Sequence, residues 1–264
     1  MIMLGELIAA FDRWFPPELA EDWDAVGLLV GRRSLPVTRV AMAVDITDAT
    51  LASAIEQEAQ CLFVHHPLYL RGTTNIDGDR WRGSLVMRAV EAGVAIFVAH
   101  TNADHARPGV SDALATALGL AETRPIRRHS SSALLGTGRF GVLAAPTTLA
   151  EFAARVAWAL PATHAGVRWA GDPDRRIVRV AVCGGSGSEL LEEVDADVYV
   201  TSDLRHHLAS DYLASGRAAL IDIPHAAAES LWLTPLAARL ELEFPALSTS
   251  VCPINTDPWS GHHA

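Results

Sequence analysis

Cysteine is scarce in this chain, and that scarcity argues against a fold held together by disulfides. The 264 residues include three cysteines, Cys61, Cys183 and Cys252, an odd number at wide spacing. Small secreted proteins that depend on disulfides carry more cysteines at closer intervals, so a reducing cytoplasm is the simplest setting. Cys61 and Cys183 fall in or beside predicted buried strands, where a free cysteine packs as a small apolar residue.

Long apolar runs and the features of a signal peptide are also missing. No apolar run approaches the roughly 20 residues that a membrane helix needs. The N-terminal segment carries Glu6, Asp12 and Arg13 and lacks the basic start and the cleavage site of a signal peptide. It is instead predicted to be an amphipathic helix that ends before Pro16 and Pro17. We therefore expect a soluble, cytoplasmic protein with no membrane partner.

Positive charge is in short supply as well. Lys and Arg number 21 against 31 for Asp and Glu, and the formal net charge is −10. A general binder of duplex DNA would show a basic face, so nucleic acid is not expected as a partner. Arg124, Arg127 and Arg128 are close in sequence, which leaves a local basic patch open as an alternative to ordinary solvated arginines.

Apolar residues make up half of the chain, which is typical of a globular protein with a sizeable core. Short apolar runs alternate with helical patterns twice along the sequence, as a weak internal duplication. In the first half the predicted strands are 39–45, 61–64 and 94–99, separated by helices at 48–60 and 83–92. In the second half they are 179–185, 197–200 and 218–222, separated by helices at 189–194 and 206–215. This alternation favours mainly parallel sheets covered on both faces.

A segment of about fifty residues joins the two predicted repeats. It contains a glycine-broken strand at 135–143, a helix at 148–160 opened by a threonine cap, and a strand at 167–170. No low-complexity linker is present, so we expect the halves to pack together. The sequence thus predicts an α/β fold of two similar halves, residues 1–125 and 126–264.

Two adjacent histidines stand at the end of a predicted buried strand. His65 and His66 follow the run 61–64, and ligands of open α/β sheets bind at the carboxyl ends of the strands. Adjacent side chains of an extended backbone point to opposite sides, so two neighbouring metal ions fit this pair better than one. Pro67 favours an extended conformation at His66. A pair of partly buried histidines without a ligand is the alternative.

Two later strand ends supply the same residue types. His100 and Asp104 follow one strand, and His225 and Glu229 follow another. His225 and Glu229 are four residues apart, which places them on one face if the segment is helical. Imidazole with carboxylate suits Zn, Fe, Mn or Co better than Ca or Mg. Together with the histidine pair, these clusters predict a site for two divalent metal ions.

With these clusters in place, the chain resembles a known family, the dinuclear-metal-centre hexameric proteins, which are also called GTP cyclohydrolase I type 2-like proteins. The similarity runs nearly from end to end, and its motifs are specific as a set, although the double histidine alone is not. The segments that carry it are Trp23-Asp24-Ala25-Val26-Gly27-Leu28-Leu29-Val30-Gly31, His65-His66-Pro67-Leu68, Ala99-His100-Thr101-Asn102-Ala103-Asp104, Gly136-Thr137-Gly138-Arg139-Phe140-Gly141, Gly171-Asp172-Pro173-Asp174, Cys183-Gly184-Gly185-Ser186-Gly187 and 222–229.

The resemblance implies five ligands around two metal ions, lying between the two halves: His65, His66, Asp104, His225 and Glu229. It makes His100 a residue beside the ligands or on the substrate side. It also implies self-association as a toroidal homohexamer with the sites facing the inner cavity. Some members of the family carry an inserted domain between the halves, and the short joining segment implies that this chain has no such third domain.

The chain departs from the family pattern at three places, none of them an implied ligand. Ala25 stands where the family usually has Asn, Ser202 stands where a Gly usually precedes Asp203, and Pro224 replaces the Gly before His225.

Three further features are weaker candidates for the site. His206 and His207 follow Asp203 at a predicted helix start, and His207 is the stronger of the two. Arg139 either pairs with a phosphate or lies on the surface, and the surface is favoured. The run Gly184-Gly185-Ser186-Gly187 either cradles a phosphate with backbone N–H groups or forms a tight strand-to-helix turn. A P-loop pattern is absent.

Two functions are open from the sequence. The first is a metal-dependent hydrolase acting on a nucleotide or a cyclic amide, because paired metal ions activate water and stabilise an oxyanion. The cyclohydrolase name fits this reaction, which is hydrolysis at an amidine-like carbon, although no residue pattern here identifies GTP. The second is a non-catalytic metal-binding ring scaffold or assembly protein. A catalytic site leaves a coordination position open, whereas a structural site is closed.

Overall fold

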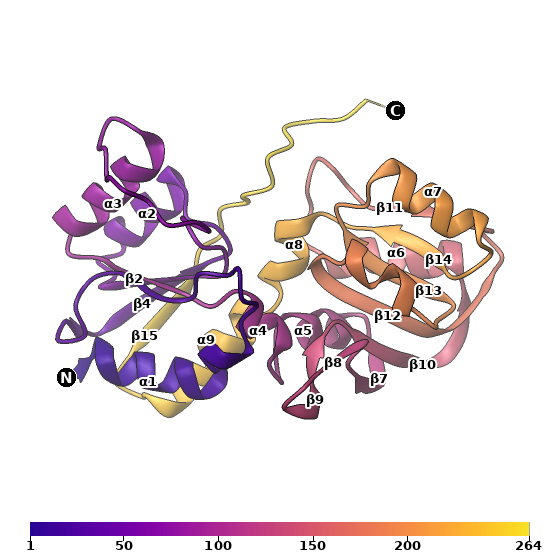
Figure 1. Cartoon of the computed structure of the whole chain (residues 1–264), viewed down its shortest axis with the longest axis horizontal. Coiled ribbons are helices and arrows are strands. Elements are labelled where there is room, and N and C mark those ends of the chain that lie inside the picture. Colours follow the sequence, from indigo (N-terminus) through magenta and orange to yellow (C-terminus); the bar gives the residue numbers. More distant parts are fainter. Residues whose placement is uncertain (264) are drawn as a thin grey trace. The chain divides into compact units, whose positions relative to one another are not determined.

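The chain folds into two compact α/β units, seen in a computed structural model that describes residues 1–263 (Figure 1). The first unit comprises Met1–Ala106 and Leu233–Thr256, and the second comprises Arg107–Trp232 and the residues from Asp257 onward. The expected fold class, α/β with two similar halves, is confirmed. The division differs from the expected boundary between residues 125 and 126 in two ways. Residues 107–125 contribute a helix and a strand to the second unit, and a C-terminal helix and strand return to the first.

The first unit is built on a five-stranded sheet in the order β15-β4-β5-β6-β2. Strands β15, β4, β5 and β6 are parallel, and β2 joins antiparallel to β6. All residues of β5 and β6 are buried, as expected for central strands covered on both faces. The bounds are β2 (Gly27–Val30), β4 (Arg39–Ala43), β5 (Cys61–Val64), β6 (Ala95–Val98) and β15 (Ser248–Val251), with a small ladder of β1 (Ile2–Met3) and β3 (Pro36–Val37).

Helices cover both faces of this sheet (Figure 1). On one face lie α2 (Asp48–Glu56) and α3 (Trp81–Glu91), whose apolar residues join the alternate side chains of β4, β5 and β6 in one cluster. On the other face lie α1 (Leu4–Trp14) and α9 (Leu233–Glu243). Phe11 of α1 contacts Phe63 and Phe97, with ring centroids 5.0 and 4.9 Å apart. This packing on both faces fixes the strands whose carboxyl ends carry the candidate ligands.

The second unit is built on a six-stranded sheet in the order β11-β14-β13-β12-β10-β7. Strands β12, β13 and β14 are parallel, whereas β7, β10 and β11 pair antiparallel. The strand expected at 135–143 is two strands that meet at Gly138, whose φ of 61° suits glycine. The bounds are β7 (Leu120–Arg124), β8 (Arg127–His129), β9 (Ser132–Thr137), β10 (Arg139–Thr148), β11 (Arg168–Ala170), β12 (Arg176–Ser186), β13 (Val198–Ser202) and β14 (Ala219–Asp222), and β8 and β9 form a separate hairpin.

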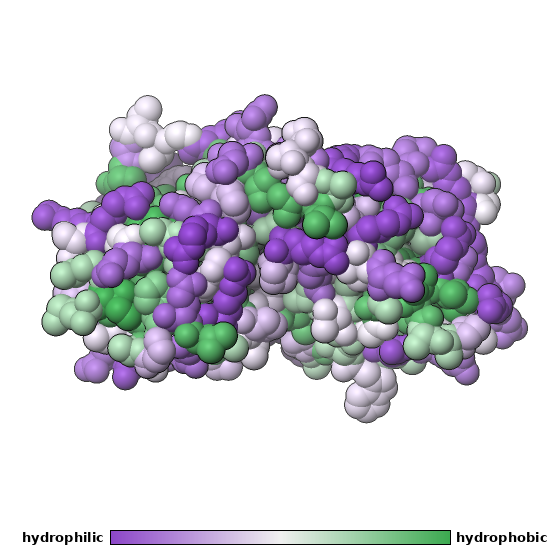
Figure 2. Space-filling model, turned by 90° about the horizontal axis from the view of Figure 1, so that it is seen from below, coloured by the Kyte–Doolittle hydropathy of each residue, from purple (hydrophilic) through white to green (hydrophobic). Residues whose placement is uncertain are grey.

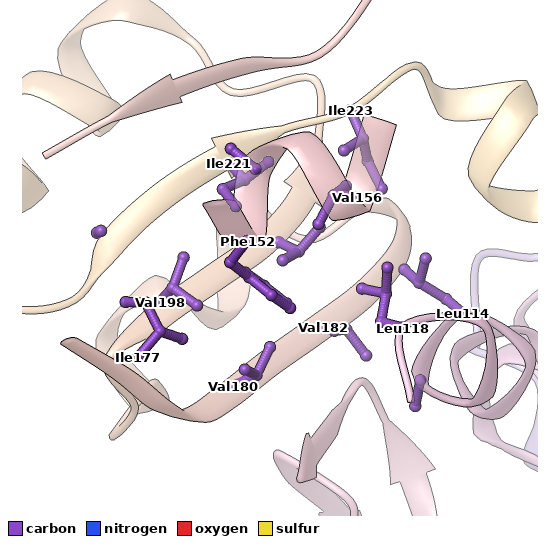
Figure 3. Close-up of a cluster of buried hydrophobic side chains, with 14 of the residues drawn as sticks. Leu114, Leu118, Phe152, Val156, Ile177, Val180, Val182, Val198, Ile221 and Ile223 are labelled. Carbon is purple, nitrogen blue, oxygen red and sulfur yellow. The ribbon is translucent and has the colours of Figure 1, made fainter. Parts of the chain in front are cut away.

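The core of the second unit lies on both faces of its sheet. On one face, Phe152 and Val156 of α6 (Leu149–Ala159) lie among the strand residues Val180 and Ile221 (Figure 3). Leu114 of α5 (Val110–Ala117) extends the same cluster. On the other face, the 3₁₀ helix η2 (Ser188–Glu193) and α7 (His206–Ala214) pack over a second cluster. The predicted threonine cap is confirmed, since the Thr148 hydroxyl accepts from Glu151 N.

The predicted duplication is visible as the same order of three parallel strands in each unit. Strands β4, β5 and β6 are neighbours in sequence order, and so are β12, β13 and β14. A short helix follows the third strand in both cases: α4 (Thr101–His105) after β6, and α8 (His225–Ser230) after β14. The two units therefore present corresponding strand ends and helix starts, which is where the candidate ligands lie.

Among residues 1–263, no helix combines the length and the apolar character needed to cross a bilayer. On the face shown in Figure 2, apolar side chains gather in several patches that hydrophilic residues separate.

Candidate metal centre

Three imidazoles come together at the carboxyl ends of the strands in the first unit. His65 and His66 follow β5, and His100 follows β6. The ring centroid of His65 lies 4.9 Å from that of His66 and 5.2 Å from that of His100, and the centroids of His66 and His100 are 5.5 Å apart. One ring nitrogen from each of the three lies within 4.8 Å of the others. These distances suit donors that share one ion or two neighbouring ions.

A backbone carbonyl and a carboxylate hold the histidine pair. His65 is fully buried, and its Nδ1 lies 2.8 Å from Ala99 O. His66 Nδ1 lies 2.8 Å from Asp45 Oδ1. Both acceptors lack a proton of their own, so Nδ1 donates in each case. Metal-binding histidines characteristically donate the other ring N–H in this way, which fixes the ring and makes Nε2 the ligand atom.

Asp24 performs the same task for His100. Asp24 Oδ1 accepts from His100 Nδ1 at 2.8 Å, and Oδ2 accepts from Thr101 N at 3.0 Å and from the Thr101 hydroxyl. Burial alone would raise the pKa of Asp24, but these hydrogen bonds and one from Ala25 N hold it well below its usual range. Asp24 is therefore an ionised carboxylate at neutral pH, and it keeps His100 oriented.

Asp104 adds a carboxylate to the three imidazoles. It lies on α4, and its Oδ1 is 3.8 Å from His65 Nε2. The helix sets its position, because Asp104 N donates to His100 O at 3.1 Å. The first unit thus brings together His65, His66 and Asp104 from the implied ligand set, and it places His100 among them.

The second unit brings together the other two implied ligands. His225 opens α8, and its Nε2 lies 2.8 Å from Glu229 Oε1, one helical turn further along. His225 Nδ1 donates to Asp203 Oδ2 at 2.7 Å. Asp203 follows β13 with a φ of 59°, a conformation that aspartate tolerates better than most residues. The pair therefore repeats the arrangement of His100 and Asp104, including the aspartate that holds the imidazole.

Gly185 lies against this pair and explains part of the glycine-rich run. A Cβ at Gly185 would come within 2.5 Å of Glu229 Oε1 and 3.3 Å of His225 Nε2, and its φ is +72°. The N–H of Gly184 donates to Ser111 Oγ, and that of Gly187 donates to Thr201 Oγ1. These two donors are used inside the unit, and the run forms the end of β12 and the entry to η2, beside two candidate ligands.

The remaining candidates from the sequence lie elsewhere. His206 and His207 are exposed at the start of α7, with ring centroids 5.1 Å apart, and Asp203 holds His225 rather than either of them. The favoured surface position of Arg139 is wrong, because this side chain is fully buried. Its Nε and Nη2 both donate to the carboxylate of Asp112 at 2.7 Å. Arg139 is therefore part of the core of the second unit.

Two of the three arginines of the local basic patch, which the sequence leaves open as an alternative, make contacts within the second unit. The Arg127 guanidinium pairs with Glu189 and Glu193. The Arg124 guanidinium lies over the ring of Phe140, 4.6 Å from its centroid.

The sequence reasoning missed the aspartates that orient the histidines. Asp45 lies two residues beyond the end of β4, and Asp24 lies in the Trp-Asp motif, but the sequence analysis gives neither a role. Asp203 was noted only for its neighbours. The signal that could have found Asp45 and Asp203 is the one that found the histidines, namely a polar residue just beyond the carboxyl end of a parallel strand.

Comparisons with known proteins match this architecture over nearly the whole chain. The sequence model of the Duf34/NIF3 (NGG1p interacting factor 3) family matches residues 2–258. A Streptomyces coelicolor protein named GTP cyclohydrolase 1 type 2 homolog is 44% identical, and the alignment covers 100% of this chain and 96% of that protein. The resemblance identified from the sequence motifs is therefore confirmed.

Longer relatives and solved structures agree. A Mycobacterium tuberculosis protein with the same name is 33% identical over 372 aligned positions, which cover 99% of this chain and 98% of that protein. Since 372 exceeds the length of this chain, that relative contains residues with no counterpart here. The crystal structure of a hypothetical Staphylococcus aureus protein superposes with a TM-score of 0.88 at 27% identity, covering 98% of this chain and 99% of the other. A Bacillus cereus protein related to NIF3 gives the same TM-score at 23% identity, covering 97% and 98%, and supports the fold.

Proposed function

The chain belongs to the Duf34/NIF3 family, and from that membership and its two sets of donors we propose that it is a dinuclear-metal hydrolase acting on a nucleotide or a cyclic amide. The observation that best supports metal binding is the hydrogen bond that each candidate histidine makes through Nδ1. Each of the four histidines at the strand ends donates Nδ1 to a carboxylate or a carbonyl. That arrangement orients imidazole rings for metal binding and costs nothing in ligand capacity at Nε2.

The proposed ligands of two divalent ions are His65, His66, Asp104, His225 and Glu229. Three histidines and two carboxylates form a donor set that suits Zn, Fe, Mn or Co. We propose that the donors of both units serve one dinuclear centre, as the family resemblance implies. The clustering of His65, His66 and Asp104 in one unit, and of His225 and Glu229 in the other, supports these five residues as ligands.

The bound ions would supply an acidified water and a stabilising charge for the oxyanion that forms during hydrolysis. Within the chain itself, His100 is the residue suited to moving a proton. Its Nδ1 is fixed on the ionised Asp24, which orients the ring and leaves Nε2 to accept or return a proton. The names of the relatives support a ring-opening hydrolysis of a purine nucleotide as the first reaction to try.

Elemental analysis of protein purified without chelator tests the centre. We expect about two divalent ions per chain, in line with the two-metal sites of hydrolases. A reproducible value near zero in both native and metal-reconstituted protein would overturn the proposal. Glu229→Gln and His65→Ala should each lower the metal content, whereas exposed His206→Ala serves as a matched control that should leave it unchanged.

Turnover tests the reaction. Metal-loaded protein screened against nucleotides and cyclic amides should hydrolyse at least one of them, and His65→Ala should abolish that activity while circular dichroism shows an intact fold. If metal-loaded protein binds two ions and turns over no member of the panel, the non-catalytic ring scaffold becomes the better description. A reducing cytoplasm is the proposed setting, in keeping with three cysteines that form no disulfide among the described residues.

A further inference from the structure

Trp23 is an exposed aromatic residue that is fixed beside the three imidazoles of the first unit. Its side chain is 58% exposed, and its ring centroid lies 6.0 Å from that of His100 with the two planes at 76°. An isolated exposed tryptophan is common on protein surfaces and means little by itself. The position of Trp23 differs because its backbone is tied to the residues that carry the imidazoles.

Hydrogen bonds on both sides of Trp23 hold its turn in place. Asp24 N donates to Glu21 O at 2.9 Å, and Glu21 N donates to the Thr101 hydroxyl at 3.0 Å. On the other side, the Asp24 carboxylate accepts from His100 Nδ1 and from Thr101 N. A flexible surface loop would let an apolar ring fold back onto the protein. This turn keeps the ring in water, next to a candidate metal centre.

We propose that Trp23 is the stacking surface for a planar heterocyclic ring of the substrate, a nucleobase or a related ring, and holds that ring beside His65, His66 and His100. The inference rests on the proposed hydrolase function and names the part of the substrate that this site recognises. Aromatic side chains bind bases through their faces, independently of the base's hydrogen-bonding pattern.

The geometry explains how stacking and chemistry are coupled. A ring stacked parallel to Trp23 would lie at the same steep angle to His100 as Trp23 does. Its face would be covered by the indole, and its edges, which carry the amidine-like carbons, would remain accessible. Trp23 and Asp24 are adjacent, so a single turn fixes both the substrate ring and the imidazole of His100. Holding the substrate and a catalytic group in a fixed orientation raises the rate of the reaction between them.

Isothermal titration of the metal-loaded full chain tests the stacking. The probes are guanosine, adenosine and uridine, with ribose as the probe that lacks a heterocycle. Trp23→Ala is compared with Trp23→Phe, which keeps an aromatic face, and with Trp81→Ala. Trp81 is a matched control because it belongs to the same unit and is 57% exposed, with its ring under the Arg82 guanidinium.

At least one nucleoside should bind the wild-type chain while ribose does not. Its dissociation constant should rise about 5- to 150-fold in Trp23→Ala, the range set by base–aromatic stacking. Trp23→Phe should recover most of the affinity, and Trp81→Ala should match the wild type. The metal content of Trp23→Ala should equal that of the wild type, because Trp23 supplies no ligand atom.

Several outcomes would overturn the inference. They are the absence of nucleoside binding to the metal-loaded wild type, equal affinity in Trp23→Ala, equal losses in Trp23→Ala and Trp81→Ala, or loss of metal in Trp23→Ala. A change of native mass in Trp23→Ala with unchanged nucleoside affinity would assign the ring to a contact between copies. Turnover that requires His65 but is unchanged in Trp23→Ala would support the hydrolase and contradict the stacking. Nucleoside binding that depends on Trp23 without any turnover would support the stacking and contradict the hydrolase.

Discussion

His66 and Thr256 are joined through one carboxylate. Asp45 Oδ1 accepts from His66 Nδ1 at 2.8 Å, and Asp45 Oδ2 accepts from the Thr256 hydroxyl. Thr256 is the last residue of the C-terminal segment that belongs to the first unit. The orientation of a candidate ligand therefore depends on two residues that lie 211 positions apart in the sequence.

Asp45→Asn should weaken metal binding about 10- to 100-fold, the usual cost of losing a group that orients a metal-binding histidine. The amide keeps the size of the side chain but removes the charge that stabilises the Nδ1–H tautomer of His66. Competition with a chelator of known affinity measures the change. Asp48→Asn is the control, since Asp48 is 75% exposed and pairs with Arg88. Equal affinity in both variants would contradict this role of Asp45.

Gly185→Ala should lower metal occupancy, because its new methyl group would meet the Glu229 carboxylate and the His225 ring. Gly216→Ala is a closely matched control. Its φ of +71° is nearly that of Gly185, but nothing lies within 4 Å of the added Cβ. Both variants should lose about 1–2 kcal/mol of stability from the left-handed backbone. Elemental analysis should separate them, and equal metal content would show that Gly185 is needed only for its conformation.

Arg139→Met should destabilise the second unit by about 3–5 kcal/mol, because it leaves the Asp112 carboxylate without its bidentate partner in the core. Urea unfolding measures the loss. Arg179→Met, which removes a half-exposed surface pair with Asp195, should cost about 1 kcal/mol or less. Replacing Arg139 and Asp112 together with apolar residues should recover part of the stability. Without such recovery, the buried ion pair would not be the source of the loss.

Cys61 should resist alkylation in the folded chain, because burial raises the pKa of its thiol to about 12. Iodoacetamide at pH 8 should label the half-buried Cys252 first, as judged by mass spectrometry, and Cys61 only on unfolding. The raised pKa of Cys61 also makes the stability of the fold depend on pH. Above the ordinary value of 9.0 the unfolded chain ionises Cys61 and the folded chain does not, so stability falls as pH rises. Rapid labelling of native Cys61 would disprove its burial.

The family resemblance predicts a homohexamer. Light scattering on the purified chain should give a mass near six times the 28.2 kDa of one chain. The mass should persist on dilution if the ring is the resting state. A mass that stays at one or two chains at every concentration would contradict the prediction.

Local sequence patterns were enough to predict the parallel core of each unit. Strand β5 lies where its apolar run predicted it, and β6 differs from its predicted range by one residue at each end. These strands are buried on both faces, so hydrophobicity alone marks them. The antiparallel edge strands β2 and β7 were not predicted, because the short apolar run of β2 lies between Gly27 and Gly31 and most of β7 is polar or exposed.

Local sequence patterns do not predict the pairing of strands that lie far apart in the sequence. Ser250 of β15 pairs with Ala41 of β4, although about two hundred residues separate them in sequence. The candidate ligands were found because histidine and carboxylate at strand ends are chemically conspicuous. The aspartates that hold the rings were missed since an aspartate after a strand is also common in ordinary turns. Their role depends on which histidine they face, and only the fold decides that.

The return of α9 and β15 to the first unit sets the order in which the chain can be completed during synthesis. The residues of the second unit up to Trp232 leave the ribosome before Leu233–Thr256. Until that segment emerges, β4 lacks its neighbour β15 and Asp45 lacks Thr256. The nascent first unit therefore carries an open sheet edge at β4 while all strands of the second unit have already been synthesised. The Asp45 carboxylate that holds His66 acquires its Thr256 contact last, so metal loading of the proposed centre should follow synthesis of the C-terminal segment.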